Sequence, residues 1–194
     1  MRESPDMAKL YLDAQTLLED SFKLAAAVAK SDFQPTFIVA LWRGGVPMGV
    51  AVQDFLQYFG IKSDHIAIRT SYYSNIDSKA EEVAVYGMNY LIKKCRYEDK
   101  LLFVDDVFDT GKTLAAVIRH LQGIARRNTP GDIRIAVPYY KPSRNETDIV
   151  PDYYLHETEQ WLKFPHSLEG LSMDEVREHR PRLAAILDKA VPAL

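Results

Sequence analysis

Continuous apolar runs separated by polar turns dominate the middle of this sequence. Such runs span residues 37–42, 101–104 and 133–139, and a further strand-like segment spans 65–72. Runs of this length are typical of strands buried on both faces of a parallel sheet. Because helical spacing follows several of them, the pattern predicts an α/β fold, with a Rossmann-like parallel sheet, helices on both faces, and a site at the carboxyl ends of the strands.

Helical spacing predicts three helices before the C-terminal segment. Ser4-Pro5-Asp6 favours a helix start, and the apolar face that follows continues to about Ser31. A second helix is expected over 47–59. A third begins at Thr110 or Thr113, with one face formed by Leu114, Val117, Ile118, Leu121 and Ile124.

The remaining segments carry weaker patterns. Residues 83–95 fit strands broken at a glycine better than a helix, although a helix is also compatible with them. Residues 71–82 are polar and aperiodic, which predicts a loop. Segments 152–156 and 161–164 resemble short strands. A C-terminal helix is expected to start at a capping box formed by Ser172 and Glu175 and to break at Pro181. We assign it no role beyond packing or subunit contact.

Composition is that of an ordinary globular protein. Of the 194 residues, 47% are hydrophobic and 26% are charged, so residues 1–194 are expected to form one domain. The net charge of −3 argues against a nucleic-acid-binding face as the main function. No signal peptide or membrane-spanning segment is apparent, and the single cysteine, Cys95, cannot form an internal disulfide. We therefore expect a cytoplasmic protein without nucleic-acid or membrane partners.

The segment LLFVDDVFDTGKT, residues 101–113, concentrates the polar chemistry. Asp105 and Asp106 end an apolar run, and a turn through Asp109 and Gly111 precedes a helix. The free N–H groups at a helix N-terminus favour a phosphate, and two adjacent carboxylates favour hydroxyl donors or Mg²⁺. Asp109 is left as a separate acid for proton transfer. The donors for the phosphate would come from Thr110, Gly111, Lys112 and Thr113.

Two other interpretations of this segment explain less. A nucleotide-binding P-loop would need glycine at position 106, where this chain has an acid. Simple helix capping would explain one aspartate or threonine, but not all six polar positions together.

A second turn of phosphate size follows the run 37–42. Arg43-Gly44-Gly45 combines an arginine, which can pair with an anion, and glycines, which let the backbone approach it. Taken alone, this tripeptide is a weak signal, because some ordinary tight turns carry it too.

The segment VDDVFDTGKT resembles the phosphoribosyl pyrophosphate (PRPP) binding motif of the type I phosphoribosyltransferases. The resemblance implies that Asp105 and Asp106 hold the ribose hydroxyls, directly or through Mg²⁺, and that Asp109 handles a proton at the base. Residues 110–113 would wrap the 5′-phosphate. By the same resemblance, Arg43, Gly44 and Gly45 would bind the pyrophosphate, with a cis peptide expected before the first glycine. Ser71 and Tyr72 would begin a flap that closes over the reacting centre.

The C-terminal part resembles the base-binding hood of the 6-oxopurine phosphoribosyltransferases, in particular their xanthine-guanine branch. The resemblance implies a hood over 141–170, in which Lys141 donates to the C6 oxygen, Trp161 stacks on the purine and Leu162 offers backbone groups to its edge. A solvated lysine and a core tryptophan are the alternatives. Where some relatives carry an acid for a second Mg²⁺, this chain has Lys163, which puts that metal in doubt. Glu157 and Glu159 are the alternative acids for it.

The function implied is purine salvage: transfer of 5-phosphoribosyl from PRPP to hypoxanthine, guanine or xanthine, with release of pyrophosphate and Mg²⁺ as cofactor. We also expect a homo-oligomer. The alternatives are a PRPP-sensing regulator that binds nucleic acid, or a transferase for adenine or a pyrimidine. A lysine donor suits an oxygen better than the amino group of adenine. The sequence does not rank the three 6-oxopurines.

Overall fold

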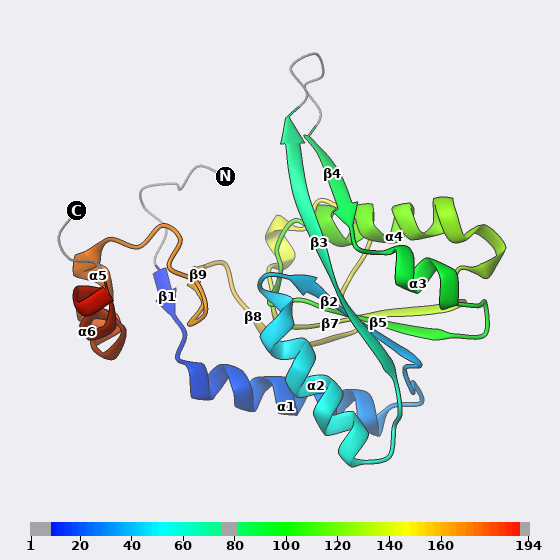
Figure 1. The fold of residues 1–194 in the computed structure, drawn as a ribbon, viewed down its shortest axis with the longest axis horizontal. Helices are drawn as coiled ribbons and strands as arrows, with labels where there is room; N and C mark the ends of the chain where they lie inside the picture. Colours follow the sequence, from blue (N-terminus) through cyan, green and yellow to red (C-terminus); the bar gives the residue numbers. More distant parts are fainter. Residues whose placement is uncertain (1–8, 75–80, 191–194) are drawn as a thin grey trace. The chain divides into compact units, whose positions relative to one another are not determined.

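The computed structural model describes residues 9–74 and 81–190, which form two compact units (Figure 1). The larger unit comprises 15–159. The smaller comprises the described parts of 1–14 and 160–194. Among the described residues, no helix combines the length and the apolar character needed to cross a membrane.

The larger unit is built on a mainly parallel sheet, as predicted. Its strands are β2 (Phe37–Trp42), β3 (Asp64–Ser74), β4 (Glu81–Tyr86), β5 (Lys100–Val104), β6 (Val107–Phe108), β7 (Asp132–Tyr140) and β8 (Tyr153–Glu157). The order is β4-β3-β2-β5-β7, and β7 also pairs with β6 and β8. The pair β3 and β4 is antiparallel, and the other pairs are parallel.

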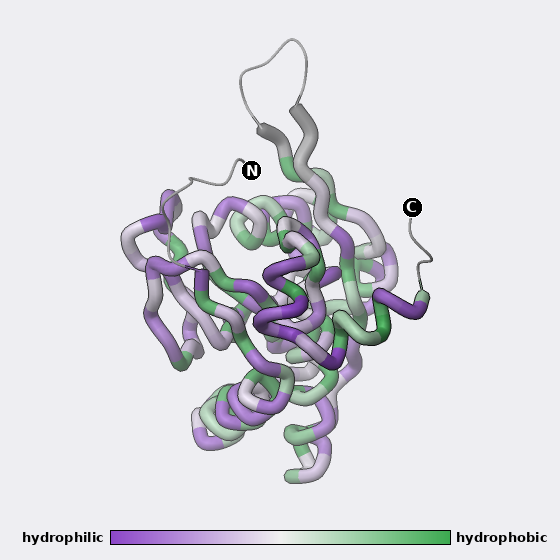
Figure 2. The backbone as a smooth tube through the Cα atoms, turned by 90° about the vertical axis from the view of Figure 1, so that its left-hand side faces the viewer, coloured by the Kyte–Doolittle hydropathy of each residue, from purple (hydrophilic) through white to green (hydrophobic). Residues whose placement is uncertain are grey.

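Helices cover both faces of this sheet (Figure 1). The helices α1 (Ala14–Lys30) and α2 (Gly45–Tyr58) lie on one side, and α3 (Asn89–Lys94) and α4 (Lys112–Ala125) lie on the other. Side chains of β2 alternate between these layers, so the strand is buried on both faces. This explains its continuous apolar run. Figure 2 shows hydrophobic and hydrophilic stretches alternating along the backbone.

Short one-turn helices follow two of the elements. Residues Arg126–Asn128 end the α4 segment, and Pro142–Arg144 follow β7. A hydrogen bond also ties α1 to β8, because the Asp20 carboxylate, 1% exposed, lies 2.7 Å from Nε2 of His156.

The smaller unit pairs the two ends of the chain. Strand β1 (Lys9–Tyr11) lies parallel to β9 (Trp161–Lys163), and α5 (Met173–His179) and α6 (Pro181–Ala190) follow. The predicted capping box is present, since the Glu175 N–H donates to Oγ of Ser172 at 3.2 Å and the Ser172 N–H donates to Glu175 at 2.8 Å. The same Glu175 binds Nζ of Lys9 at 2.6 Å, which links α5 to β1.

The predicted first helix was wrong over residues 9–13. Its expected start at Ser4-Pro5-Asp6 lies outside the described residues, Leu10 belongs to a strand, and the helix begins at Ala14. The reason is the backbone of β9, a partner about 150 residues away in sequence, which pairs with residues 9–11 and draws them into a strand.

Two further predictions need correction. The strand prediction for 83–95 was wrong in its second half, where α3 forms from Asn89 to Lys94. The predicted loop over 71–82 is shorter, because β3 continues to Ser74 and pairs with Glu81 of β4. Residues 75–80 lie outside the described part. Polar residues are tolerated in this extension because an antiparallel ribbon satisfies its backbone without needing two apolar faces.

Glycines of α2 and α4 allow a matched test of this packing. A Cβ on Gly49 would lie 2.7 Å from Cβ of Ala40 in β2, whereas one on Gly123 would meet nothing within 4 Å. Overpacking costs about 1–3 kcal/mol, and replacing a helical glycine by alanine gains about 1 kcal/mol. We expect Gly49→Ala to lower the free energy of unfolding and Gly123→Ala to raise it, as measured by urea denaturation. A stabilised Gly49→Ala variant would contradict the close approach of α2 to β2.

Candidate active site

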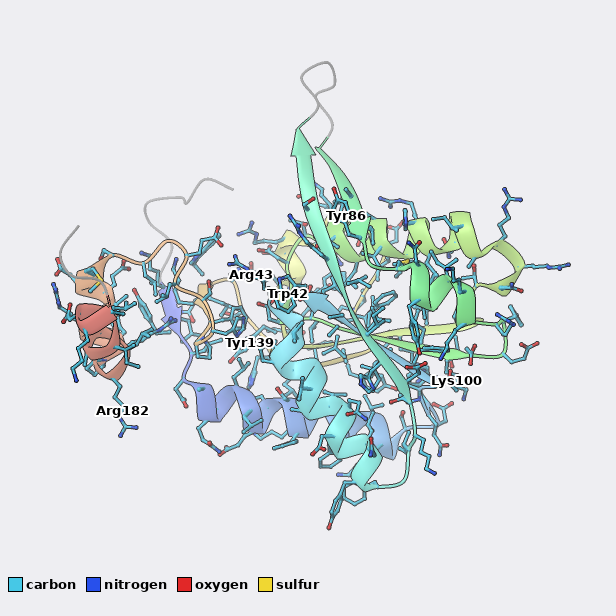
Figure 3. The ribbon with its side chains drawn as sticks, in the orientation of Figure 1. Trp42, Arg43, Tyr86, Lys100, Tyr139 and Arg182 are labelled. Atoms are coloured by element: carbon cyan, nitrogen blue, oxygen red, sulfur yellow. The ribbon has the colours of Figure 1, made fainter. Side chains whose placement is uncertain are left out.

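Three polar turns lie at the carboxyl ends of three neighbouring strands. Strand β5 ends at Val104 and is followed by the acid pair, β2 is followed by Arg43-Gly44-Gly45, and β7 is followed by Lys141. Because β2, β5 and β7 are parallel and adjacent, these turns share one edge of the sheet. Figure 3 shows Arg43 beside Trp42 at the end of β2. The structure therefore brings together the two turns predicted to bind phosphate groups.

The glycine turn packs directly against the acid pair. A Cβ on Gly44 would overlap the carboxylate of Asp106, and a Cβ on Gly45 would overlap the carbonyl oxygen of Val104. Gly45 is also the first residue of α2, so the free N–H groups of that helix start beside the acids. A Cβ fits at Gly44 only if the Asp106 carboxylate moves and at Gly45 only if the backbone moves, which explains both glycines.

The acid pair carries more negative charge than its surroundings favour. Burial, followed by the charge of Asp106, raises the pKa of Asp105 well above its ordinary value. The N–H of Asp106 donates to Oδ1 of Asp105 at 3.0 Å, and the N–H of Gly45 also binds this carboxylate. Two carboxylates at one edge fit a hard divalent cation or sugar hydroxyls, either of which would offset their repulsion.

The turn after β6 forms the predicted helix start. Gly111 has a φ of 75°, which is left-handed, and a Cβ there would lie 2.6 Å from Oγ1 of Thr147. Helix α4 begins at the next residue, Lys112, one position before Thr113. The N–H of Lys112 lies 3.4 Å from Oγ1 of Thr110. The residues predicted to hold a phosphate are thus gathered at one helix N-terminus.

A carboxylate flanked by two cations lies beside this turn. Nζ of Lys141 is 3.6 Å from Oδ2 of Asp109, and Nε of Arg144 is 2.7 Å from Oδ1. Lys141 is only 2% exposed. Burial lowers the pKa of Lys141, and the Asp109 charge opposes that shift. Lys141 is therefore not the solvated lysine of the alternative interpretation.

Sequence reasoning missed two residues of this site. Arg144 pairs with Asp109, and Oε2 of Glu146 lies 2.5 Å from Nζ of Lys112. The sequence does not identify either residue as part of the site, because both come from the segment after β7, which only the folded chain places beside Asp109 and Lys112. The only available signal was their place within five residues of Lys141.

One detail of the arginine turn differs from the prediction. The cis peptide joins Trp42 to Arg43, one bond earlier than the expected position before Gly44. The Arg43 side chain itself is exposed.

None of the contacts given above involves the residues predicted to form the flap and the hood. Ser71 lies in β3, and among the described residues its buried hydroxyl has no hydrogen-bond partner. The backbone of Tyr72 pairs with Val83 of β4. Trp161 and Leu162 lie in β9 of the smaller unit and are partly buried. Their roles in closing the site and binding a base stay predictions.

The predicted hood is divided between the two units. Residues 141–159, which include β8, belong to the larger unit, and residues from 160 onward belong to the smaller one. The base-binding hood over 141–170 stays a prediction. A cleft of about 610 Å³ lies elsewhere in the larger unit, between α4 and the 149–152 segment, and contains none of the predicted site residues.

Comparisons with known proteins agree on one family. The model of the phosphoribosyl transferase domain matches residues 7–175. No protein with a curated description matches the sequence.

Similar solved structures span most of the chain. A purine phosphoribosyltransferase from Pyrococcus horikoshii is 27% identical, with a TM-score of 0.66, and the match covers 86% of this chain and 98% of that one. A hypothetical protein from Neisseria gonorrhoeae with bound ppGpp is 20% identical, with a TM-score of 0.72 over 94% and 99%. The xanthine-guanine-hypoxanthine phosphoribosyltransferase of Helicobacter pylori is 21% identical, with a TM-score of 0.59 over 80% and 92%. With the domain matching most of its length, this chain belongs to the phosphoribosyltransferase family.

Proposed function

We propose that this enzyme transfers the 5-phosphoribosyl group of PRPP to a 6-oxopurine, releases pyrophosphate, and uses Mg²⁺. The observation that carries this proposal is the buried lysine beside Asp109, at the carboxyl edge where the two phosphate-sized turns meet. A base held there would meet a hydrogen-bond donor and an acid together. The printed names of two similar structures, which are purine phosphoribosyltransferases, support the same substrate class.

Each part of PRPP has a candidate partner at this edge. Residues 110–113, at the start of α4, would bind the 5′-phosphate. Arg43 and the backbone of Gly44 and Gly45 would bind the pyrophosphate. Asp105 and Asp106 would hold the ribose hydroxyls and the metal. Bound there with substrate oxygens, Mg²⁺ would neutralise charge on the leaving pyrophosphate.

The base is assigned from the chemistry of its neighbours. An ammonium group donates hydrogen bonds and accepts none, so Lys141 suits an oxygen at C6 and disfavours the amino group of adenine. Trp161 and Leu162 would add a stacking face and backbone groups, as predicted for the hood. Ser71 and Tyr72 would help to exclude water, which competes for the sugar.

The transfer exchanges one bond at C1′ of the ribose for another. The bond from C1′ to the pyrophosphate oxygen breaks, its electron pair leaves with pyrophosphate, and a ring nitrogen of the base bonds to C1′. That nitrogen then carries a proton it must lose. Asp109 would accept its hydrogen bond, then the proton, and pass it to water.

A base panel tests this function. Purified protein with PRPP and Mg²⁺ is offered hypoxanthine, guanine, xanthine, adenine, uracil and orotate separately, and pyrophosphate release is measured. We expect turnover only with one or more of the three 6-oxopurines. A reaction without Mg²⁺ is the control for the metal. Turnover confined to uracil, orotate or adenine would overturn the base assignment. PRPP binding without any turnover, accompanied by salt-sensitive binding of nucleic acid, would favour the regulator instead.

The role of Asp109 is tested by Asp109→Asn. Asparagine keeps the size of the side chain but cannot take a proton, and general acid-base catalysis contributes about 10²- to 10⁴-fold in rate. We expect kcat to fall by such a factor, with much less change in the affinity for PRPP. The two quantities are compared by steady-state kinetics and by calorimetric titration of PRPP. Unchanged turnover would remove Asp109 from the mechanism.

The contact between the glycine turn and the acids is tested by Gly44→Ala. The backbone at Gly44, with φ −59° and ψ −42°, accepts alanine, but the new Cβ must displace the Asp106 carboxylate. We expect the melting temperature to change little and KM for PRPP to rise about tenfold or more.

Gly45→Ala is the matched comparison, because its Cβ would overlap a backbone carbonyl that has no room to move. This variant should lose stability, with about 1–3 kcal/mol of overpacking. An unchanged KM in Gly44→Ala would show that Asp106 does not contact PRPP or its metal.

The remaining predictions, a homo-oligomer, a cytoplasmic location and a doubtful second Mg²⁺, rest on the sequence alone. Purine salvage would follow from the proposed reaction, because it converts a free base directly into a nucleotide.

A further inference from the structure

The segment after β7 runs alongside the turn that carries Asp109. The N–H of Lys141 donates to the carbonyl oxygen of Phe108 at 2.9 Å, and the N–H of Glu146 donates to that of Thr110 at 3.0 Å. These two backbone hydrogen bonds lie on either side of Asp109. The segment 141–146 is therefore fixed against the turn by its main chain, independently of any side chain.

The same segment is also braced internally. The N–H of Arg144 donates to the carbonyl oxygen of Lys141 at 3.1 Å, which closes a one-turn helix. The side chain of Asn145 donates to the carbonyl oxygen of Ile149 at 2.8 Å and accepts the N–H of Thr147 at 2.9 Å. Arg144 thus extends from a backbone whose position is set on both sides, which lowers the entropy cost of holding its guanidinium in place.

The two cations beside Asp109 differ in kind. The guanidinium of Arg144 is always charged and lies 2.7 Å from Oδ1, with both side chains about three-quarters buried. Among the described residues, this buried Oδ1 has no hydrogen-bond partner, so the contact is an ion pair and not an aligned hydrogen bond. Lys141 is 3.6 Å from Oδ2 and is almost fully buried, so burial opposes its charge. Glu159 lies near the pair as a further charge and accepts a hydrogen bond from Ser143. The closest and most permanent partner of the Asp109 carboxylate is Arg144.

We propose that Arg144 is a positioning residue for Asp109: its guanidinium, 2.7 Å from Oδ1, holds the carboxylate in one orientation by charge attraction and leaves the acceptor positions of the carboxylate for the base. This inference rests on the proposed function and adds to it a residue that neither the sequence pattern nor the comparisons assign. An ion pair gives little net stability in either setting: about 1 kcal/mol or less at the surface, and less than its full attraction where burial removes water from both charges. The pair is therefore poorly explained as a stabilising contact, whereas misplacing a reacting group by about 1 Å can cost about 10²-fold in rate.

Steady-state kinetics of Arg144→Ala, with the base that the unaltered protein prefers, tests the proposal. We expect kcat to fall about 10- to 100-fold while KM for PRPP changes little. Arg144→Lys keeps a cation but loses the planar fork, so it should recover only part of the rate. Guanidinium ion at non-denaturing millimolar concentration should restore part of the activity of Arg144→Ala, which a purely structural role would not predict.

A double variant separates two ways in which Arg144 could act. If it acts through Asp109, adding Arg144→Ala to Asp109→Asn should lower kcat little further, because residues that act as a unit are not additive. Losses that multiply would overturn the proposal and indicate an independent contact with substrate. Arg127→Ala, which removes an exposed arginine after α4, is the control and should match the unaltered protein.

A crystal structure of Arg144→Ala gives a result that does not depend on turnover. The proposal expects the Asp109 carboxylate to adopt a new orientation or more than one. A single unchanged orientation, or an unchanged kcat, would overturn the positioning role while leaving the proposed function intact. If the unaltered protein turns over no base, the proposed function fails, and the orientation of Asp109 still decides whether Arg144 positions it.

Discussion

The contact between a glycine backbone and a pair of acids is the constraint on which this site depends. Gly44 and Gly45 lie so close to Asp106 and to the end of β5 that a side chain at either glycine would displace the acid or the backbone. This closeness requires β2 and β5 to be adjacent and parallel, with both ending at the same edge. The buried apolar runs of these strands supply that arrangement. The packing that buries β2 and β5 side by side is thus also what places the glycine turn against the acids.

The same close contact also determines which charges and dipoles surround the two acids. Bringing the start of α2 against the acids places backbone N–H groups beside carboxylates, and the N–H of Gly45 binds Asp105. The same closeness removes water, and burial raises the pKa of Asp105. The fold therefore accepts two repelling carboxylates at the end of a buried strand. A cation or sugar hydroxyls bound between the acids and the phosphate-sized turn would offset the repulsion between the two carboxylates.

The sequence predicts best what local interactions decide. Continuous apolar runs identified the buried strands, and glycine and capping chemistry identified the start of α4 and the capping box at Ser172. The prediction failed where a partner distant in sequence determines the secondary structure, as in β1, whose backbone pairs with β9. The same limit applies within the site. Asp109 and Lys141 could be predicted from a motif and a family pattern, but Arg144 could not, because its position depends on how the fold returns the segment after β7.

That returning segment links two parts of the site that the sequence presents as separate. Arg144 pairs with Asp109, the predicted proton acceptor, and two residues later Glu146 pairs with Lys112 of the predicted phosphate turn. A phosphate arriving at Lys112 would meet a carboxylate that already holds the same ammonium, so the two anions would compete. The carbonyl oxygen of Thr110 also accepts the N–H of Glu146. A movement of residues 141–146 on phosphate binding would therefore also move Arg144 and change its contact with Asp109. The charge pairs and backbone hydrogen bonds of one short segment thus connect the phosphate end of the site physically to its acid.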